Sequence, residues 1–177
     1  MKRWIVLLRG VTPTGKNRVP MADFREALGR AGFQNARTWI QSGNALVDTP
    51  LNREETIKAV SRVLAEDIGA DLTVIVKTAD ELRWVLDGNP FTDGLPERVF
   101  YGQFQQQPDK AKVKALLVND FGEEKLVITD WAVYCYIPGS AARAKLTNAF
   151  LERKLGVRLT TRNANTLNKL VALAKEI

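Results

Sequence analysis

Hydrophobic and polar positions along the first half of the chain predict four strands and two helices. The apolar run over 3–8 suits a short buried strand, and a polar loop over 9–19 follows it. Pro20 then begins a helix whose apolar residues lie three or four apart, and Gly32 ends it. The remaining elements predicted in this half are strands over 36–40 and 45–47, a helix, and a last strand over 72–76.

Two local signals support this interpretation of the first half. The segment 41–44 separates two strands and contains Gly43, which supplies the positive φ that a tight hairpin needs. Asn52 and Glu55, three residues apart, form a capping-box pattern at the start of the second helix, which Gly69 ends.

The second half repeats the same order of elements. It predicts a strand over 99–104, a helix from about residue 108, strands over 125–128 and 132–137, a helix ending at Gly156, a short strand over 158–160 and a final helix. Residues Val133, Cys135 and Ile137 alternate onto one face of their strand, where Cys135 serves as a small buried hydrophobe.

The fold class predicted from these elements is α+β, with two ferredoxin-like (βαββαβ) halves, antiparallel sheets and an additional C-terminal helix. We place the first half at residues 1–86, a connector at 87–96 and the second half with the C-terminal helix at 97–177. The halves share the order of their elements without recognisable sequence similarity, so a duplication is only suggested.

The composition is that of a folded protein, since 45% of the 177 residues are hydrophobic and 26% are charged. The chain has no histidine and a single cysteine, which excludes an internal disulfide framework, the usual zinc sites and histidine-based triads. We therefore expect no metal and no cofactor. Apolar runs such as residues 4–8 are too short to span a membrane, so we expect a cytoplasmic protein without a membrane partner.

Basic residues gather at the two ends of the sequence, and the formal net charge is +6. Residues 141–177 hold eight basic and two acidic side chains, whereas residues 1–22 hold five basic and no acidic ones. If folding brings the two ends together, they form a positive surface that attracts anionic ligands or nucleic acid. The alternative is that the C-terminal helices simply carry solvated lysine and arginine side chains.

Residues 10–17, GVTPTGKN, match the phosphate-binding P-loop pattern except at Asn17, which replaces the serine or threonine that binds magnesium. A P-loop lysine lies in the first turn of a helix, whereas here Pro20 begins the helix only after Lys16. This difference argues against a nucleoside triphosphatase. A glycine-flanked loop with Arg9, Lys16 and Arg18 can still bind a phosphate or a carboxylate.

A second polar cluster, residues 160–166, lies just before the final helix. Helix N-caps explain two or three of its hydroxyl and amide side chains. They do not explain Arg162 and Lys169, because a cation near the start of a helix opposes the helix dipole. An anion site and plain helix capping therefore both stay open for this cluster.

Short motifs along nearly the whole chain occur in the order and at the spacing of one bacterial family. They are Leu8-Arg9-Gly10, Gly15-Lys16-Asn17, Pro20-Met21, Gly32-Phe33, Ile40-Gln41-Ser42-Gly43-Asn44, Asn89-Pro90-Phe91, Lys145-Leu146, Thr161-Arg162-Asn163, Asn165-Thr166 and Lys169-Leu170. In these motifs the chain resembles the family of uncharacterised proteins catalogued as domain of unknown function 1697.

The resemblance implies a small cytoplasmic bacterial protein with two ferredoxin-like halves and no established activity. The polar positions that it carries over from the family pattern are Arg9, Lys16, Asn17, Ser42, Asn44, Arg162, Asn163, Asn165 and Lys169. The chain departs from the family in two places. Its loop 10–15 differs from the usual Gly-Ile-Asn-Val-Gly-Gly, and Ala164 stands where a tryptophan is typical.

From these observations we expect a protein that binds an anionic ligand, either nucleic acid or a phosphorylated small molecule. The candidate ligand-binding residues are Arg9, Lys16, Asn17, Arg18, Ser42, Asn44, Arg162, Asn163, Asn165 and Lys169. A first alternative is a small enzyme without histidine, in which Lys16 or Lys169 stabilises charge that develops on an anionic substrate. A second alternative is an interaction module that assembles through a sheet edge.

The order of elements also makes a spatial prediction. In a βαββαβ half, the loop over 9–19 and the turn over 42–44 lie at the same end of the sheet. The polar cluster before the final helix would have to dock at that same end to complete the site. In that case we expect Arg9 or Lys16 to lie within about 10 Å of Arg162 or Lys169, which is about one Debye length.

Overall fold

The computed structural model describes residues 1–176, which divide into two compact units. Unit 1 comprises Met1–Asp80 and the chain from Lys169 onward, and unit 2 comprises Glu81–Asn168. The last helix therefore begins in unit 2 and ends in unit 1. The boundaries that the sequence suggests at residues 86 and 97 stay a prediction.

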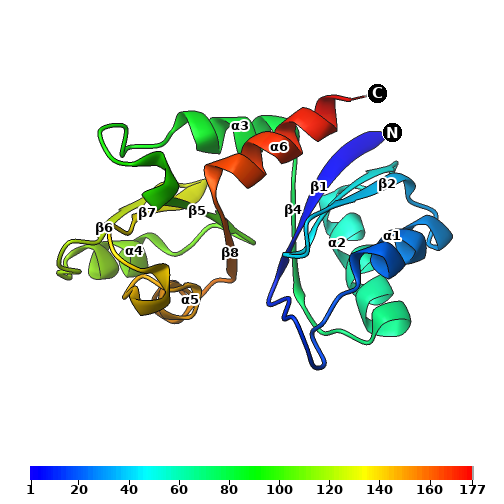
Figure 1. Ribbon diagram of the computed structural model, residues 1–177, viewed down its shortest axis with the longest axis horizontal. Helices are drawn as coiled ribbons and strands as arrows, with labels where there is room; N and C mark the ends of the chain where they lie inside the picture. The colour runs from blue at the N-terminus through cyan, green and yellow to red at the C-terminus, as the bar shows by residue number, and fades with distance from the viewer. Residues whose placement is uncertain (177) are drawn as a thin grey trace. The chain divides into compact units, whose positions relative to one another are not determined.

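Unit 1 forms a four-stranded antiparallel sheet with two helices on one of its faces (Figure 1). Its elements are β1 (Lys2–Arg9), α1 (Met21–Arg30), β2 (Gln34–Trp39), β3 (Asn44–Thr49), α2 (Arg53–Val63) with a π-helical turn over Leu64–Ile68, and β4 (Thr73–Lys77). The strand order is β2-β3-β1-β4, and every neighbouring pair is antiparallel. This is the ferredoxin-like arrangement that the order of elements predicts.

The alternation of side chains along β1 separates the two faces of this sheet. Trp4, Val6 and Leu8 are buried in one core with residues of both helices, including Phe24 of α1 and Val60 of α2. The intervening residues of β1 point to the opposite face because successive side chains of a strand alternate. That opposite face carries the polar contacts and the candidate site described below.

Both helices of unit 1 begin and end where the sequence predicts. The side chain of Asn52 accepts a hydrogen bond from the backbone N–H of Glu55, and the Glu55 carboxylate accepts one from the N–H of Asn52. This reciprocal capping box satisfies two donors that a helix start leaves without intrahelical partners. Gly32 and Gly69 adopt left-handed backbone conformations, with φ of 94° and 79°, just after the ends of their helices.

Unit 2 repeats the arrangement with a second antiparallel sheet, in the order β6-β7-β5-β8. The elements of the second half are α3 (Ala79–Asp87), β5 (Val99–Phe104), α4 (Lys110–Leu117), β6 (Lys125–Ile128), β7 (Ala132–Tyr136), α5 (Asn148–Leu155), β8 (Leu159–Arg162) and α6 (Ala164–Lys175), with short 3-10 turns at Pro96–Arg98 and Ala141–Arg143. The α+β class with two ferredoxin-like halves and a C-terminal helix is thus confirmed. No helix within residues 1–176 combines the length and the apolar composition needed to cross a bilayer.

Several strand boundaries shift by one or two residues from the sequence prediction, and two of these shifts have a clear physical reason. Strand β2 ends at Trp39, because Ile40 has a left-handed φ of 50° and already belongs to the hairpin turn. Strand β8 extends to Arg162, because Thr161 and Arg162 continue the antiparallel pairing with β5. Thr161, which the sequence analysis placed in the polar cluster before the final helix, therefore belongs to a strand, as its branched side chain favours.

The sheet of unit 2 carries helices on both faces. Val133, Cys135 and Ile137 are buried in a core with residues of α4 and α5, as their alternation predicts. On the other face, the hydroxyl of Tyr134 donates a 2.8 Å hydrogen bond to the backbone carbonyl of Val85 in α3. Burial, and secondarily the neighbouring Tyr101, raises the pKa of Tyr134 to about 12, so this hydroxyl keeps its proton.

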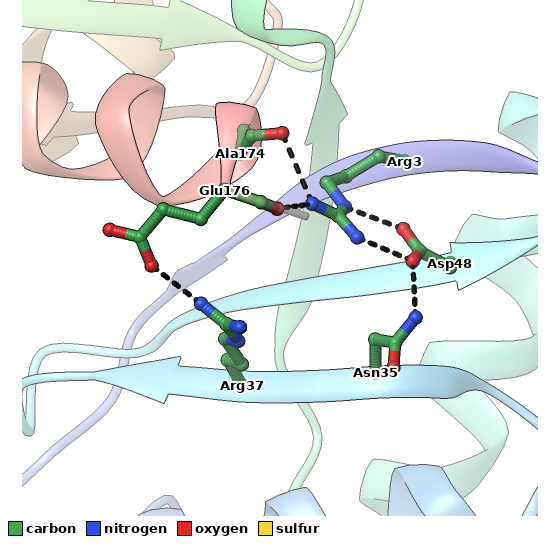
Figure 2. A network of polar contacts seen from close by, with 6 residues as sticks. All are labelled: Arg3, Asn35, Arg37, Asp48, Ala174 and Glu176. Carbon is green, nitrogen blue, oxygen red and sulfur yellow. Dashed lines mark hydrogen bonds and ion pairs between the residues drawn. The ribbon is translucent and has the colours of Figure 1, made fainter.

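A polar network on the sheet face opposite α1 and α2 holds the end of α6 (Figure 2). The guanidinium of Arg3 donates two hydrogen bonds to the Asp48 carboxylate, at 2.7 and 2.6 Å, and Asn35 donates a third at 2.8 Å. Arg3 also donates to the backbone carbonyls of Ala174 and Glu176, which helix geometry leaves without partners at a C-terminus. A cation at this end also interacts favourably with the helix dipole.

The capping box of α2 gives a direct test of local helix stabilisation. We expect Asn52→Ala to lower the free energy of unfolding by about 1 kcal/mol, because the backbone N–H of Glu55 loses the side-chain oxygen that accepts its hydrogen bond. Urea unfolding followed by circular dichroism measures the change. The control is Glu54→Ala, a neighbouring glutamate outside the capping box, and an equal loss in both variants would contradict this assignment.

The Arg3–Asp48 pair predicts a pH-dependent contribution to stability. Hydrogen bonding from Arg3, helped by Asn35, lowers the pKa of Asp48 in the folded protein below its unfolded value of about 3.9. The unfolded chain therefore takes up this proton first as the pH falls. The contribution of Asp48 is complete above about pH 5 and is lost as the pH falls through the unfolded and then the folded pKa.

The expected result is that Asp48→Asn costs about 2 kcal/mol near neutral pH, where it removes a charged hydrogen-bonding partner of Arg3. The difference from the natural protein should shrink as the pH falls from 5 to about 2, because protonation removes the same charge. Urea unfolding at a series of pH values measures it, with the exposed Asp71→Asn as the matched control. A difference that stays constant down to pH 2 would show that the pair contributes nothing through its charge.

Candidate functional site

The loop between β1 and α1 is folded through its own backbone. Gly10 and Gly15 both have positive φ, and the N–H of Thr12 donates to the carbonyl of Asn17 at 3.0 Å. Val19 is fully buried and anchors the end of the loop. Because α1 begins only at Met21, the N-terminal amides of this helix do not surround a phosphate beside Lys16, as they would in a P-loop.

The cations of this loop differ in exposure. Lys16 and Arg18 are exposed, whereas Arg9 is half-buried at the end of β1. Asn17 lies between the two exposed cations, and its Oδ1 is a buried atom that accepts no hydrogen bond within residues 1–176. The loop therefore presents two exposed cations, which flank Asn17 in the sequence.

The β2–β3 turn is the second component of the site. Asn44 is fully buried, and its Nδ2 donates to the backbone carbonyl of Trp39 and to Oγ of Ser42, both at 3.0 Å. Ile40 has a φ of 50°, a conformation that β-branched residues rarely adopt. Its side chain is nevertheless 49% exposed, so burial does not explain why an apolar residue occupies this strained position.

The loop and the turn are in direct contact, as the spatial prediction requires. The N–H of Leu8 donates to the carbonyl of Gly43 at 2.8 Å, and Nε2 of Gln41 donates to the carbonyl of Val19 at 2.7 Å. A Cβ atom placed on Gly43 would lie only 2.7 Å from Cγ2 of Val11. Residues 10–19 and 40–44 thus form one continuous surface at one end of unit 1, which we call the loop–turn surface.

The C-terminal helix adds a cation to this end of the sheet. The Nζ atom of Lys169 lies 5.1 Å from the centroid of the Trp39 ring, which is cation–π geometry. Trp39 is paired with Asn44 in the β2–β3 ladder, so the two side chains share a face of the sheet. The chain thus brings Lys169 next to the turn residues although 125 positions separate it from Asn44 in the sequence.

Three of the predicted residues belong to unit 2. Arg162 is buried, and its guanidinium donates to Oγ1 of Thr160 at 2.7 Å and to the backbone carbonyl of Thr161 at 2.9 Å. Desolvation lowers the pKa of Arg162 to about 10, so it stays charged at neutral pH. Asn163 accepts a hydrogen bond from the N–H of Thr166 at the start of α6, and Asn165 is exposed.

The structure therefore gathers part of the predicted set. Unit 1 brings the cations of the 10–19 loop, the turn residues Ser42 and Asn44, and Lys169 to one end of its sheet. The capping interpretation holds for Asn163, whereas ligand binding by Arg162, Asn163 and Asn165 stays a prediction. The residues that sequence reasoning missed are Trp39 and Ile40, and an aromatic side chain immediately before the predicted hairpin was the signal that could have found them.

Gly43 tests the contact between loop and turn. We expect Gly43→Ala to lower the free energy of unfolding by about 2–4 kcal/mol. The new methyl group clashes with Val11 and Leu8, and an alanine is also strained in the left-handed backbone conformation of this position. Gly69→Ala is the matched control, since its φ is also positive but open space surrounds the added methyl group, so only about 1 kcal/mol should be lost. Equal losses in chemical denaturation would mean that the close approach contributes nothing.

Comparisons with known proteins agree with the motifs and the fold. The chain is similar to a conserved bacterial protein from Streptococcus pneumoniae of known structure, with a TM-score of 0.76 and 20% sequence identity over 98% of each chain. This likeness concerns the fold alone. No curated protein matches the chain. The model of the family described as protein of unknown function (DUF1697) matches residues 1–134, which confirms the resemblance seen in the motifs: the chain belongs to this family.

Proposed function

We propose that unit 1 binds single-stranded nucleic acid at the loop–turn surface and the adjoining Trp39–Lys169 pair. The observation that carries the proposal is the cation–π contact of Lys169 with Trp39 beside a loop that presents Lys16 and Arg18. Proteins that bind single strands combine cations that follow the phosphates with aromatic or apolar side chains on which bases stack. This surface contains both kinds of group.

The charges favour an extended polyanion as the ligand. Lys16 and Arg18 lie on the loop, whereas Lys169 comes from α6 and lies over Trp39, so the cations are provided by separate parts of the surface. Separate exposed cations suit successive phosphates, each of which contributes to affinity by releasing counterions. The exposed and strained Ile40 of the adjoining turn supplies an apolar contact, as expected where a bound base replaces water.

A phosphorylated small molecule is the alternative ligand. Asn17 supports it, because its buried Oδ1 lies between the loop cations and can accept a hydrogen bond from a sugar or base. Such a ligand would need only the phosphate contacts of the loop. Its binding would therefore depend on Lys16 and Arg18 and little on Lys169.

Salt dependence distinguishes the two ligands. We expect a labelled oligothymidylate of about 20 nucleotides to bind with an affinity that falls steeply with salt, and Lys169→Ala to reduce the slope of log K against log[salt] by about 0.7. The double variant Lys16→Ala/Arg18→Ala should reduce it by about twice that amount. Fluorescence anisotropy between 50 and 200 mM salt measures these slopes.

The matched control is Lys58→Ala, an exposed lysine of α2, which packs on the opposite face of the sheet. This variant should keep both the affinity and the slope of the natural protein. Absence of oligonucleotide binding at 50 mM salt would exclude the nucleic-acid proposal. Competition by inorganic phosphate or a nucleoside triphosphate at micromolar concentration, unaffected by Lys169→Ala, would instead support the small-molecule alternative.

A further inference from the structure

Unit 2 contains a cavity of about 260 Å³ beside the helix-covered face of its sheet. Strands β5, β7 and β8 form one wall, and the segment 141–148, which leads into α5, forms the other. All of the residues that line it belong to unit 2, so this site does not depend on the anion site of unit 1.

The cavity lies beside a row of paired residues that differs between the two halves. In unit 1, Val6 in the middle of β1 pairs with Ala45 and Val76, so that apolar side chains fill the centre of the helix-covered face. The corresponding row in unit 2 has Gly102 paired with Val133 and Thr161. A hydrogen atom thus replaces an isopropyl group at the centre of the row. On one side a threonine replaces a valine, and on the other Val133 replaces the smaller Ala45.

The wall of the cavity is apolar and carries no charge. None of its lining residues is acidic or basic, and the main apolar contributors are Phe100, Val133, Cys135, Ile137, Leu146 and Leu151. Burial raises the pKa of the Cys135 thiol to about 12, so this group also stays neutral at physiological pH. A charged ligand would lose its hydration without gaining a partner here.

One end of the cavity is polar. The hydroxyl of Thr161 donates a 2.5 Å hydrogen bond to Oδ1 of Asn148, and both residues line the cavity. This bond uses the hydroxyl proton of Thr161 and one acceptor of Asn148. The lone pairs of the hydroxyl and the amide NH2 group are the remaining hydrogen-bonding capacity of these side chains.

We propose that this cavity binds a small neutral molecule that is apolar over most of its surface and carries one hydrogen-bonding group. An apolar cavity of about 150 Å³ already binds benzene, so the larger volume here accommodates a molecule with about ten non-hydrogen atoms. The apolar part contacts the side chains between Phe100 and Leu151, and the polar group lies against Thr161 and Asn148.

Indole is a suitable probe because it is neutral, has nine non-hydrogen atoms and donates one hydrogen bond. We expect calorimetry or NMR titration of the full chain to give a Kd at or below about 1 mM, within the ligand efficiency of small apolar sites. Indole-3-acetate should bind at least about tenfold more weakly, because no cation lines the cavity to compensate its carboxylate.

Two alanines of the same segment provide a matched pair of variants. Ala144 lines the cavity, whereas Ala142 is exposed and does not. Ala144→Phe should abolish indole binding by filling the opening, and Ala142→Phe should leave it unchanged. Thr161→Val, which replaces the hydroxyl by a methyl group of similar size, should weaken indole binding by about fivefold, the effect of one neutral hydrogen bond.

Gly102→Val tests the origin of the cavity, because it restores the apolar row of unit 1. The added Cβ lies 3.2 Å from Cβ of Val133, so the strands must shift slightly, and Ala144→Phe decides the matter if this variant fails to fold. Loss of indole binding in Ala144→Phe alone supports the proposal. Absence of indole binding to the natural chain, or equal binding to both phenylalanine variants, overturns it.

Discussion

The guanidinium of Arg3 joins three parts of unit 1 that are far apart in the sequence. It binds the carboxylate of Asp48 on the neighbouring strand and the free carbonyls of Ala174 and Glu176 at the end of α6. Because Arg3 donates to both carboxylate oxygens of Asp48, its guanidinium is held in the position from which it also binds the end of α6. The cation–π contact of Lys169 depends on this placement, because Lys169 and Ala174 belong to the same rigid helix.

The two units show how one topology supports two kinds of surface chemistry. Both have the strand order of a ferredoxin-like half, with two of its helices packed against one face in a hydrophobic core. Unit 1 fills the centre of that face with Val6 and places its polar groups at the end of the sheet, where loop and turn meet. Unit 2 leaves the corresponding position empty at Gly102 and buries the cation Arg162 on its other face. The difference lies in single side chains, which the backbone arrangement does not determine.

The elements were predictable because their signals are local. Asn52 with Glu55, and Gly43 in its turn, act within a few residues of themselves, and apolar periodicity identifies the covered faces. The site was only partly predictable, because its geometry depends on the return of α6 to the first sheet. No local pattern reveals that Lys169 packs on Trp39. The burial of Arg162 was also hidden, since it follows from an extension of β8 that polar residues do not suggest.

The shared helix has a consequence for the order in which the protein is made. Strand β4 ends at Lys77, whereas the part of unit 1 that supplies Lys169 and the carbonyls for Arg3 is synthesised about 90 residues later. At translation rates of about 5–20 residues per second, this interval lasts about 5–20 s. During that time the nascent first sheet exists without its C-terminal partner while the whole second unit emerges. Unit 1 is therefore synthesised as two stretches of the chain, one before and one after unit 2, and it becomes complete only late in synthesis.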